Sequence, residues 1–327
     1  MEQSAVRDGV TAEEVKGILL GMASGQETLL GYFRRFIRNF EKRVGINRTV
    51  GSLRAYSNAY SHIERFLQAQ YKLSDIPFSA LDRSFIDKYD LYLRTERNLA
   101  PGTIINLTVQ LKTIVGEAIA DGIITASPFM GYEPVRPKHV QKYLTAEELH
   151  RIMTIPLHRQ TLYHVRDMFL FSCFTGIPYG DMRLLTKDNL CLAEDGIWWI
   201  KSARQKTKIE FEIPLLDLPL QILKKYSDTA PGDKLLPMYC NSTLNLYLKE
   251  IARICHIDRP LVFHAGRHTY ATEITLSHGV PLETVSRMLG HSQIETTQIY
   301  AKVTDEKIDA DTKALNRKIS ERFSVVI

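Results

Sequence analysis

Two histidines, an arginine and a tyrosine lie in one short stretch of the chain, from His264 to Tyr300. His264 and Arg267 form an H-x-x-R pair, His291 follows a Leu-Gly pair, and Tyr300 lies 300 − 291 = 9 positions further on. Guanidinium and imidazole groups can hold a phosphate, and a tyrosine hydroxyl can attack one. We therefore expect the four side chains to converge on one phosphodiester, with Tyr300 as the nucleophile.

The chemistry of a phosphodiester explains why these residue types belong together. Negative charge develops on the non-bridging oxygens, and the planar, permanently charged guanidinium of Arg267 fits two of them. Tyrosine has a pKa of about 10, so a cationic site and a neighbouring histidine are needed to lower the cost of ionising it. Because the cations are side chains, no metal or cofactor is needed. A phosphotyrosine would conserve bond energy, so rejoining would need no ATP.

Helices and a small sheet must position this stretch. Residues 161–175 are hydrophobic nearly all round and predict a central buried helix that ends at Gly176. Residues 196–215 predict an antiparallel hairpin with a basic tip. Thr145-x-x-Glu148 predicts a capping box, and Ser292-x-x-Glu295 is expected to cap the helix that carries Tyr300. Further helices are predicted over residues 179–186, 217–228, 241–254, 266–278, 281–290 and 305–322.

The first part of the chain predicts a separate, all-helical domain. Helical patterns cover residues 28–44, 50–70 and 83–95, and a fourth begins at Pro101, with no strand pattern between them. Their aromatic stripes are expected to form the core. Residues 1–25 are polar, and a capping box at Thr11 predicts a helix over residues 11–22. Residues 131–142 contain two prolines and predict a polar, basic linker.

Length and composition fit a soluble protein of two domains. The 327 residues are 44% hydrophobic and 24% charged, and the net charge of +5 is compatible with nucleic acid without requiring it. The four cysteines form no C-x-x-C pair, which indicates a reducing compartment and no structural zinc. With no signal peptide and no long apolar run, a cytoplasmic, nucleoid-associated protein with no membrane contact is expected.

The H-x-x-R-H-T-x-A-T, L-G-H-S and tyrosine series resembles the tyrosine recombinase (phage-integrase type) family, most nearly the integrases of mobile elements and conjugative transposons. The resemblance implies a mainly helical fold with a small antiparallel β-hairpin or sheet. Its domains would be a helical, SAM-like core-binding domain at residues 26–130 and a catalytic domain at 143–327, with residues 1–25 the remnant of an arm-binding module. It implies Tyr300 as nucleophile, Arg267 on the phosphate, His264 and His291 as donors, and Lys206 as general acid for the leaving 5′ oxygen.

One position departs from the family pattern. Pro178 stands where most of the family has the first of two arginines that hold the phosphate. We favour Arg204 as its substitute, because Arg204 and Lys206 are two residues apart and would share a face of an extended hairpin. Arg183 is the alternative, and a site without a substitute remains open.

Other residues near these motifs have two interpretations each. Asp181 either orients an arginine or histidine or is a simple charge near a helix start. His268 is expected to be structural beside Arg267, and Tyr179 and Tyr270 are expected to pack rather than react. The basic residues expected to contact DNA phosphates are Lys201, Lys208 and Arg136, although the segment around Arg136 could also be a plain connector.

The expected function is site-specific strand exchange on double-stranded DNA through a 3′-phosphotyrosine, which would serve the integration or excision of a mobile element. The family implies four protomers on two DNA sites, and accessory DNA-bending or directionality proteins are further candidate partners. Two alternatives stay open. One is relaxation of single duplexes, as by a type IB topoisomerase, and the other is a catalytically silent DNA-binding regulator, which the proline at position 178 motivates.

Overall fold

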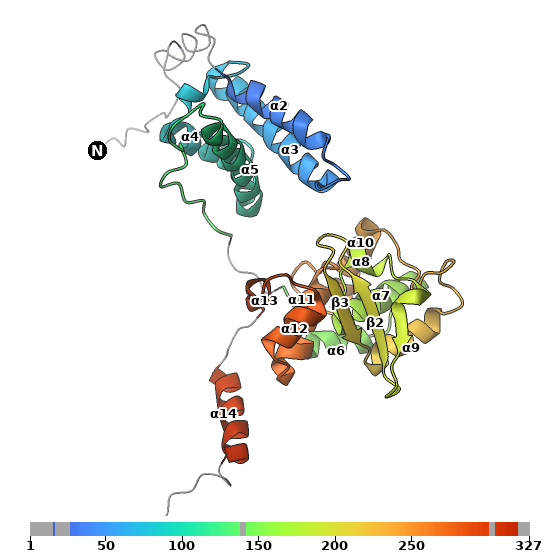
Figure 1. Cartoon of the computed structure of the whole chain (residues 1–327). Helices are drawn as coiled ribbons and strands as arrows, with labels where there is room; N and C mark the ends of the chain where they lie inside the picture. The colour runs from blue at the N-terminus through green and yellow to red at the C-terminus, as the bar shows by residue number, and fades with distance from the viewer. Residues whose placement is uncertain (1–15, 17–26, 138–141, 301–304, 320–327) are drawn as a thin grey trace, which may run out of the picture. The chain divides into compact units, whose positions relative to one another are not determined.

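The computed structural model describes residue 16 and residues 27–137, 142–300 and 305–319. The chain divides into two compact units, residues 1–139 and 140–327, and each is described by itself (Figure 1). The helix predicted over residues 11–22 falls almost wholly outside the described residues. No helix in the described ranges combines the length and the apolar character that crossing a membrane requires.

The first unit is helical, as predicted. Its α-helices are α2 (Leu29–Glu41), α3 (Val50–Phe66), α4 (Arg83–Thr95) and α5 (Pro101–Ala120), and a π-helical turn, Leu67–Tyr71, extends α3. The side chains of Thr49 and Asp82 cap α3 and α4 by accepting backbone N–H bonds. The aromatic stripes form the core, where Phe33, Phe66 and Tyr89 are almost completely buried. Their helical spacing therefore reflects packing, as expected.

Helix α7 (Gln160–Thr175) is the centre of the second unit. It is buried nearly all round, and α9 (Asp217–Tyr226), α10 (Asn241–Ile254) and α11 (Ala265–Thr269) pack against it. It ends at Gly176, whose φ of +70° is a left-handed conformation. A Cβ at Gly176 would lie 2.5 Å from Cδ1 of Tyr270, so glycine is required for this close approach.

A small antiparallel sheet lies beside these helices. Its strands β1 (Leu190–Leu192), β2 (Trp198–Ala203) and β3 (Glu210–Pro214) are hydrogen-bonded in that order, with Ile200 opposite Ile213. The hairpin β2–β3 confirms the prediction. Strand β1 was not predicted, because three residues are too few to show a period. Helix α12 (Leu282–Leu289) packs against β3, which joins the sheet to the second histidine motif (Figure 1).

The remaining helices correct several predicted bounds. Helix α6 (Ala146–Thr154) has the predicted capping box, but the helix predicted over 179–186 is only α8 (Tyr179–Met182), before a 3-10 turn, Lys187–Asn189. The helix predicted over 266–278 is α11, a π-helical segment Tyr270–Thr275 and a 3-10 turn Leu276–His278. Thr275 interrupts the α pattern by donating its hydroxyl hydrogen bond to the backbone oxygens of Tyr270 and Ala271.

The helix before the predicted nucleophile is short. Helix α13 covers Glu295–Gln298, and its N-cap is Ile294, so the predicted cap by Ser292 is wrong. Tyr300 lies two positions beyond the last residue of α13, with its backbone N–H donating to the oxygen of Thr297 at 3.0 Å. Helix α14 (Asp305–Ile319) begins at the predicted residue, whereas residues 320–322 of that prediction lie outside the described part of the chain.

Candidate active site

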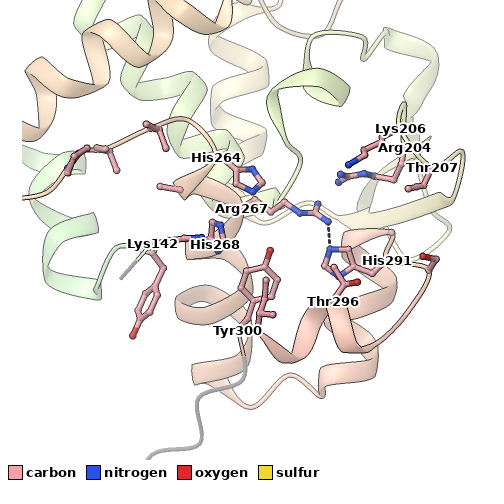
Figure 2. Close-up of a pocket in the computed structure, with 18 of the residues that line it drawn as sticks. Lys142, Arg204, Lys206, Thr207, His264, Arg267, His268, His291, Thr296 and Tyr300 are labelled. Carbon is pink, nitrogen blue, oxygen red and sulfur yellow. Dashed lines mark hydrogen bonds between the residues drawn. The ribbon is translucent and has the colours of Figure 1, made fainter. Parts of the chain in front are cut away.

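A cavity of about 890 Å³ in the second unit collects the predicted side chains. His264, Arg267, His291 and Tyr300 all line it. Arg204, Lys206, Lys142, His268 and Thr296 line it as well. Figure 2 shows Arg204 and Lys206 directed toward the guanidinium of Arg267 from the hairpin side, with Tyr300 approaching from the opposite side.

Arg267 lies at the floor of the cavity, 3% exposed. Its Nη1 donates to the backbone oxygen of Gly176 at 2.9 Å, and its Nη2 donates to the oxygen of Leu289 at 2.7 Å. Helix α11 can bring the guanidinium there because Gly266 packs directly on α7, where a Cβ would lie 2.8 Å from Oγ of Ser172. Burial, followed by the neighbouring charge of Arg204, lowers the pKa of Arg267 to about 10, so the group is charged at neutral pH.

His264 and His268 form one wall of the site. Their ring centroids are 4.9 Å apart, and the ring of His268 meets that of Tyr300 edge-on at 5.1 Å. Burial lowers the pKa of both histidines, to about 4 for His268, and the charge of Arg267 contributes to both shifts. His268 was expected to be structural, but the structure places it in the cavity against the tyrosine.

His291 lies on the other side of Tyr300. It follows Gly290, whose φ of +64° ends α12 and turns the chain into the cavity. Its Nε2 is 2.8 Å from Nη2 of Arg267, and its Nδ1 is 2.7 Å from Oγ1 of Thr297. Burial, followed by the charge of Arg267, lowers its pKa to about 4, and its ring stacks on Tyr300 with centroids 6.3 Å apart.

Tyr300 is therefore the tyrosine of this site. Its side chain is held between the rings of His268 and His291, and the residue is only 6% exposed. The other two tyrosines that were considered are packing residues. The hydroxyl of Tyr270 approaches Sδ of Met288 at 3.9 Å, and burial raises its pKa, whereas Tyr179 packs edge-on against Phe263. Neither Tyr270 nor Tyr179 lines the cavity.

Arg204 brings a second guanidinium to the cavity. Its Nε lies 3.0 Å from Oδ2 of Asp181, whose other oxygen accepts the backbone N–H of Gln205 at 2.9 Å. The Nη1 of Arg204 points to the oxygen of Leu289, at 3.5 Å, the same acceptor that Arg267 uses. The two arginines are thus neighbours. Asp181 contacts Arg204, which agrees with the interpretation that Asp181 orients an arginine.

The positions around Pro178 provide no cation to the cavity. Pro178 is the N-cap of α8. Arg183 is exposed, its guanidinium lies 5.9 Å from the centroid of the Tyr179 ring, and it does not line the cavity. The geometry therefore favours Arg204 over Arg183, although the reason given from the sequence was wrong. Residues 204–208 form a turn closed by a hydrogen bond from Lys208 N to Arg204 O at 2.8 Å, not an extended strand with two faces.

The basic residues of the hairpin divide into two groups. Lys206 is exposed on the turn and lines the cavity. Lys201 and Lys208 are exposed but do not line it, and Lys201 forms an ion pair with Glu212 at 3.5 Å. Arg136 is exposed in the first unit.

Thr297 and Lys142 were missed by the sequence reasoning. Thr297 is completely buried against His291, and Lys142 lines the cavity from the chain segment before α6. A hydroxyl three positions before the predicted nucleophile could have suggested the former. Nothing in the sequence near Lys142 points to a site formed by residues much further along the chain.

The second unit has a cavity that joins three arginines, three histidines and a buried tyrosine, and a separate helical unit precedes it. Such a cavity suits an enzyme that acts on phosphodiesters through tyrosine. The chain belongs to the phage integrase family, which it matches over residues 142–307, and residues 28–134 match the phage integrase SAM-like domain. It is thus a tyrosine site-specific recombinase, an enzyme of DNA cleavage and religation. The predicted fold class is confirmed: mainly helical, with a SAM-like core-binding domain and an integrase catalytic domain.

Known relatives agree with this family. The tyrosine recombinase XerD of Listeria monocytogenes is 25% identical over 273 residues, covering 78% of this chain and 89% of its own. In fold, the chain is similar to the Tn1549 transposon integrase in complex with transposon right end DNA, with a TM-score of 0.69 at 18% identity over 88% of this chain and 99% of that one. The chain is also similar in fold to a lambda integrase dimer bound to a core site, with a TM-score of 0.68 at 18% identity. This similarity covers 85% of this chain and 100% of the lambda integrase chain.

Proposed function

We propose that this recombinase integrates or excises a mobile element by exchanging strands of double-stranded DNA through a 3′-phosphotyrosine. The observation that carries the proposal is the position of Tyr300, buried between two neutral histidines in a cavity that also holds Arg267 and Arg204. Two guanidiniums beside one tyrosine can stabilise the charge of a phosphoryl group in transfer.

In the proposed reaction, the hydroxyl oxygen of Tyr300 forms a bond to the phosphorus, and the bond from phosphorus to the 5′ oxygen breaks. The tyrosine proton passes to His268, whose ring meets that of Tyr300 and which burial keeps neutral. His264, whose ring contacts that of His268, would assist this proton movement. Lys206 donates a proton to the leaving 5′ oxygen. Its place on an exposed turn that lines the cavity supports this role. In the rejoining step, the freed 5′ hydroxyl of a partner strand attacks the phosphotyrosine, a bond forms from that oxygen to phosphorus, and Tyr300 leaves.

Arg204 is proposed to replace the arginine that the family usually has at the position of Pro178. Its support is the ion pair with buried Asp181, which holds the side chain toward the cavity, and the acceptor it shares with Arg267. The cost of placing two like charges together is offset by Asp181 and, in the complex, by the phosphate.

The partners are proposed from the family and from the charges. Four protomers would act on two DNA sites, with accessory DNA-bending or directionality proteins where the element supplies them. A second hollow of about 380 Å³ adjoins the cavity and is lined by Lys249, Arg253, His256 and Arg259. It shares Arg259, Pro260 and Leu261 with the cavity, so a DNA backbone leaving the reaction centre would pass basic side chains there.

The mobile-element role rests on the fold similarity to two integrases, the Tn1549 and lambda proteins, and on the substitution at Pro178. Recovery of a site from the ends of a mobile element, when the DNA site is selected, would support this role.

The experiment begins by selecting bound duplexes from a random library with the full chain. Duplexes that carry the selected site and a nick near the expected cleavage position are then incubated with the protein and analysed in SDS. We expect a covalent adduct between the protein and the DNA fragment that ends at the cleaved 3′ phosphate, detected by a label on that fragment. The Tyr300→Phe protein should form no such adduct. An adduct with Tyr300→Phe would overturn the assignment, and no adduct with the unaltered protein would favour a silent DNA-binding regulator. Relaxation of plasmids that lack the site would favour the topoisomerase alternative.

A further inference from the structure

Thr297 is a buried polar residue at the centre of the site. It is 0% exposed, and its Oγ1 lies 2.7 Å from Nδ1 of His291. Its backbone oxygen accepts the N–H of Tyr300. One residue therefore contacts the histidine through its side chain and the nucleophile through its backbone.

The hydrogen bonds of His291 define which nitrogen carries the proton. A guanidinium has donors only, so the contact between Nη2 of Arg267 and Nε2 of His291 requires a lone pair on Nε2. Because burial keeps the imidazole neutral, its one proton is on Nδ1. Oγ1 of Thr297 accepts that proton in a hydrogen bond.

This tautomer is the wrong one for holding a phosphate. A phosphate oxygen needs donors, and in the structure described above Nε2 offers a lone pair instead. When Nη2 of Arg267 turns to the phosphate, Nε2 loses its donor and can contribute only if it carries a proton. A threonine hydroxyl can either accept or donate by rotation, so it can satisfy Nδ1 in both tautomers.

We propose that Thr297 is a positioning residue whose hydroxyl holds the His291 ring in both tautomers, so that His291 can change from accepting a hydrogen bond of Arg267 to donating one to the DNA phosphate. In this change the Nδ1 proton passes to solvent water and a water proton binds Nε2, so the ring stays neutral. The hydroxyl of Thr297 then donates to Nδ1. The inference rests on the proposed function, because it assigns the donor role of His291 to the same phosphate.

Single-turnover cleavage of the nicked duplex tests the role of the hydroxyl. Thr297→Val keeps the shape of the side chain and removes both hydrogen-bonding capacities, and we expect cleavage to slow by about 10- to 100-fold. Thr297→Ser should be within about 3-fold of the unaltered protein. Thr108→Val is the matched control, because Thr108 is a buried threonine on α5 of the first unit, 3% exposed, and its hydroxyl donates to the backbone oxygen of Ile104 in the same helix.

A double-substitution cycle separates this role from a general loss of structure. If Thr297 acts through His291, then Thr297→Val adds no further loss in a protein that already carries His291→Ala. Equal losses in both backgrounds, or an effect of Thr297→Val below about 2-fold, would overturn the proposal.

Nitrogen-15 NMR of the histidine rings gives a readout that needs no cleavage. The ring of His291, assigned by comparison with His291→Gln, should show the Nδ1–H tautomer in the DNA-free protein. It should show the Nε2–H tautomer when Tyr300→Phe protein is bound to the intact selected duplex. An unchanged tautomer in the complex, or Nε2–H in the free protein, contradicts the inference even if cleavage proceeds through Tyr300. If no adduct ever forms, the proposed function fails, whereas the tautomer of His291 in the free protein still tests the hydrogen-bond assignment on which the role of Thr297 rests.

Discussion

Replacing Arg204 with alanine should remove one of the two guanidiniums from the reaction centre. In the proposed reaction Arg204 supplies charge-assisted donors to a phosphate whose charge grows in the transition state, and each such donor contributes about 1.5–3 kcal/mol. Loss of one preorganised donor at such a site typically costs about 10²–10³ in rate. We therefore expect Arg204→Ala to slow single-turnover cleavage by about 10²–10³. Arg204→Lys keeps a charge but loses the planar fork, so its loss should be smaller.

The same substitution also affects stability, and the assay must separate the two effects. The Arg204 side chain is 17% exposed and that of Asp181 is 5% exposed, so removing the arginine leaves a buried carboxylate without its ion-pair partner. Breaking a buried pair costs about 3–5 kcal/mol. Adding Asp181→Asn to Arg204→Ala removes the unpaired charge. The double variant should recover much of the lost melting temperature while its cleavage remains slow.

Arg183→Ala is the matched comparison. Arg183 is exposed over the Tyr179 ring and does not line the cavity, so its loss should change cleavage by no more than about 3-fold. Cleavage rates measured on the nicked duplex, with DNA affinity checked separately, decide between the two arginines. Cleavage by a folded Arg204→Ala protein within about 3-fold of normal, or a larger loss with Arg183→Ala, would refute the assignment.

Further predictions concern the leaving group, the pH dependence of stability and the path of the DNA. Lys206→Ala should slow cleavage by about 10²–10⁴, and a duplex with sulfur in place of the bridging 5′ oxygen should recover the rate, because a thiolate leaves without a proton. Lys208→Ala should affect the oxygen and sulfur substrates equally, and failure of sulfur to rescue Lys206→Ala would contradict a general acid there. Arg259, through its ion pair with Glu148, lowers the pKa of that carboxyl below its ordinary value of 4.5. Because the pKa of Glu148 is lower in the folded protein than in the unfolded chain, the ionised carboxylate stabilises the fold at a pH above the unfolded pKa. This contribution should be lost as the pH falls below about 4.5. When the melting temperature is measured against pH, Glu148→Gln should reduce its fall at acid pH, whereas Glu147→Gln, at an exposed position, should not. An unchanged fall with Glu148→Gln would show that the ion pair does not contribute to stability. The double variant Lys249→Glu, Arg253→Glu should bind DNA more weakly. Loss of two phosphate contacts should also reduce the slope of log affinity against log salt concentration by about 1.8. Lys224→Glu on α9 serves as the control, and an unchanged slope would exclude the second hollow from the DNA path.

The helices show how far local patterns reach. Amphipathic stripes predicted α2 to α5, and an apolar run predicted α7. A helix that is buried on one face has apolar residues at helical spacing, and a helix that is buried on all sides is apolar throughout, so both patterns can be recognised in the sequence. Strand β1 escaped because three residues carry no period, and it forms only by pairing with β2. The cap by Ser292 failed because the chain after Gly290 is directed by the contacts of His291 with Arg267 and Thr297, and not by local preference.

The sequence by itself determined which side chains of one stretch meet in the cavity. The types and spacing of His264, Arg267, His291 and Tyr300 were sufficient, because they lie within one stretch whose order is a local property. Only the tertiary structure decided that Arg204 and Arg267 share the backbone oxygen of Leu289, and that the hydroxyl of Thr297 contacts Nδ1 of His291. These relations depend on the packing of α7, α11, α12 and the β2–β3 turn around one cavity, and no spacing along the chain encodes distances between segments that far apart.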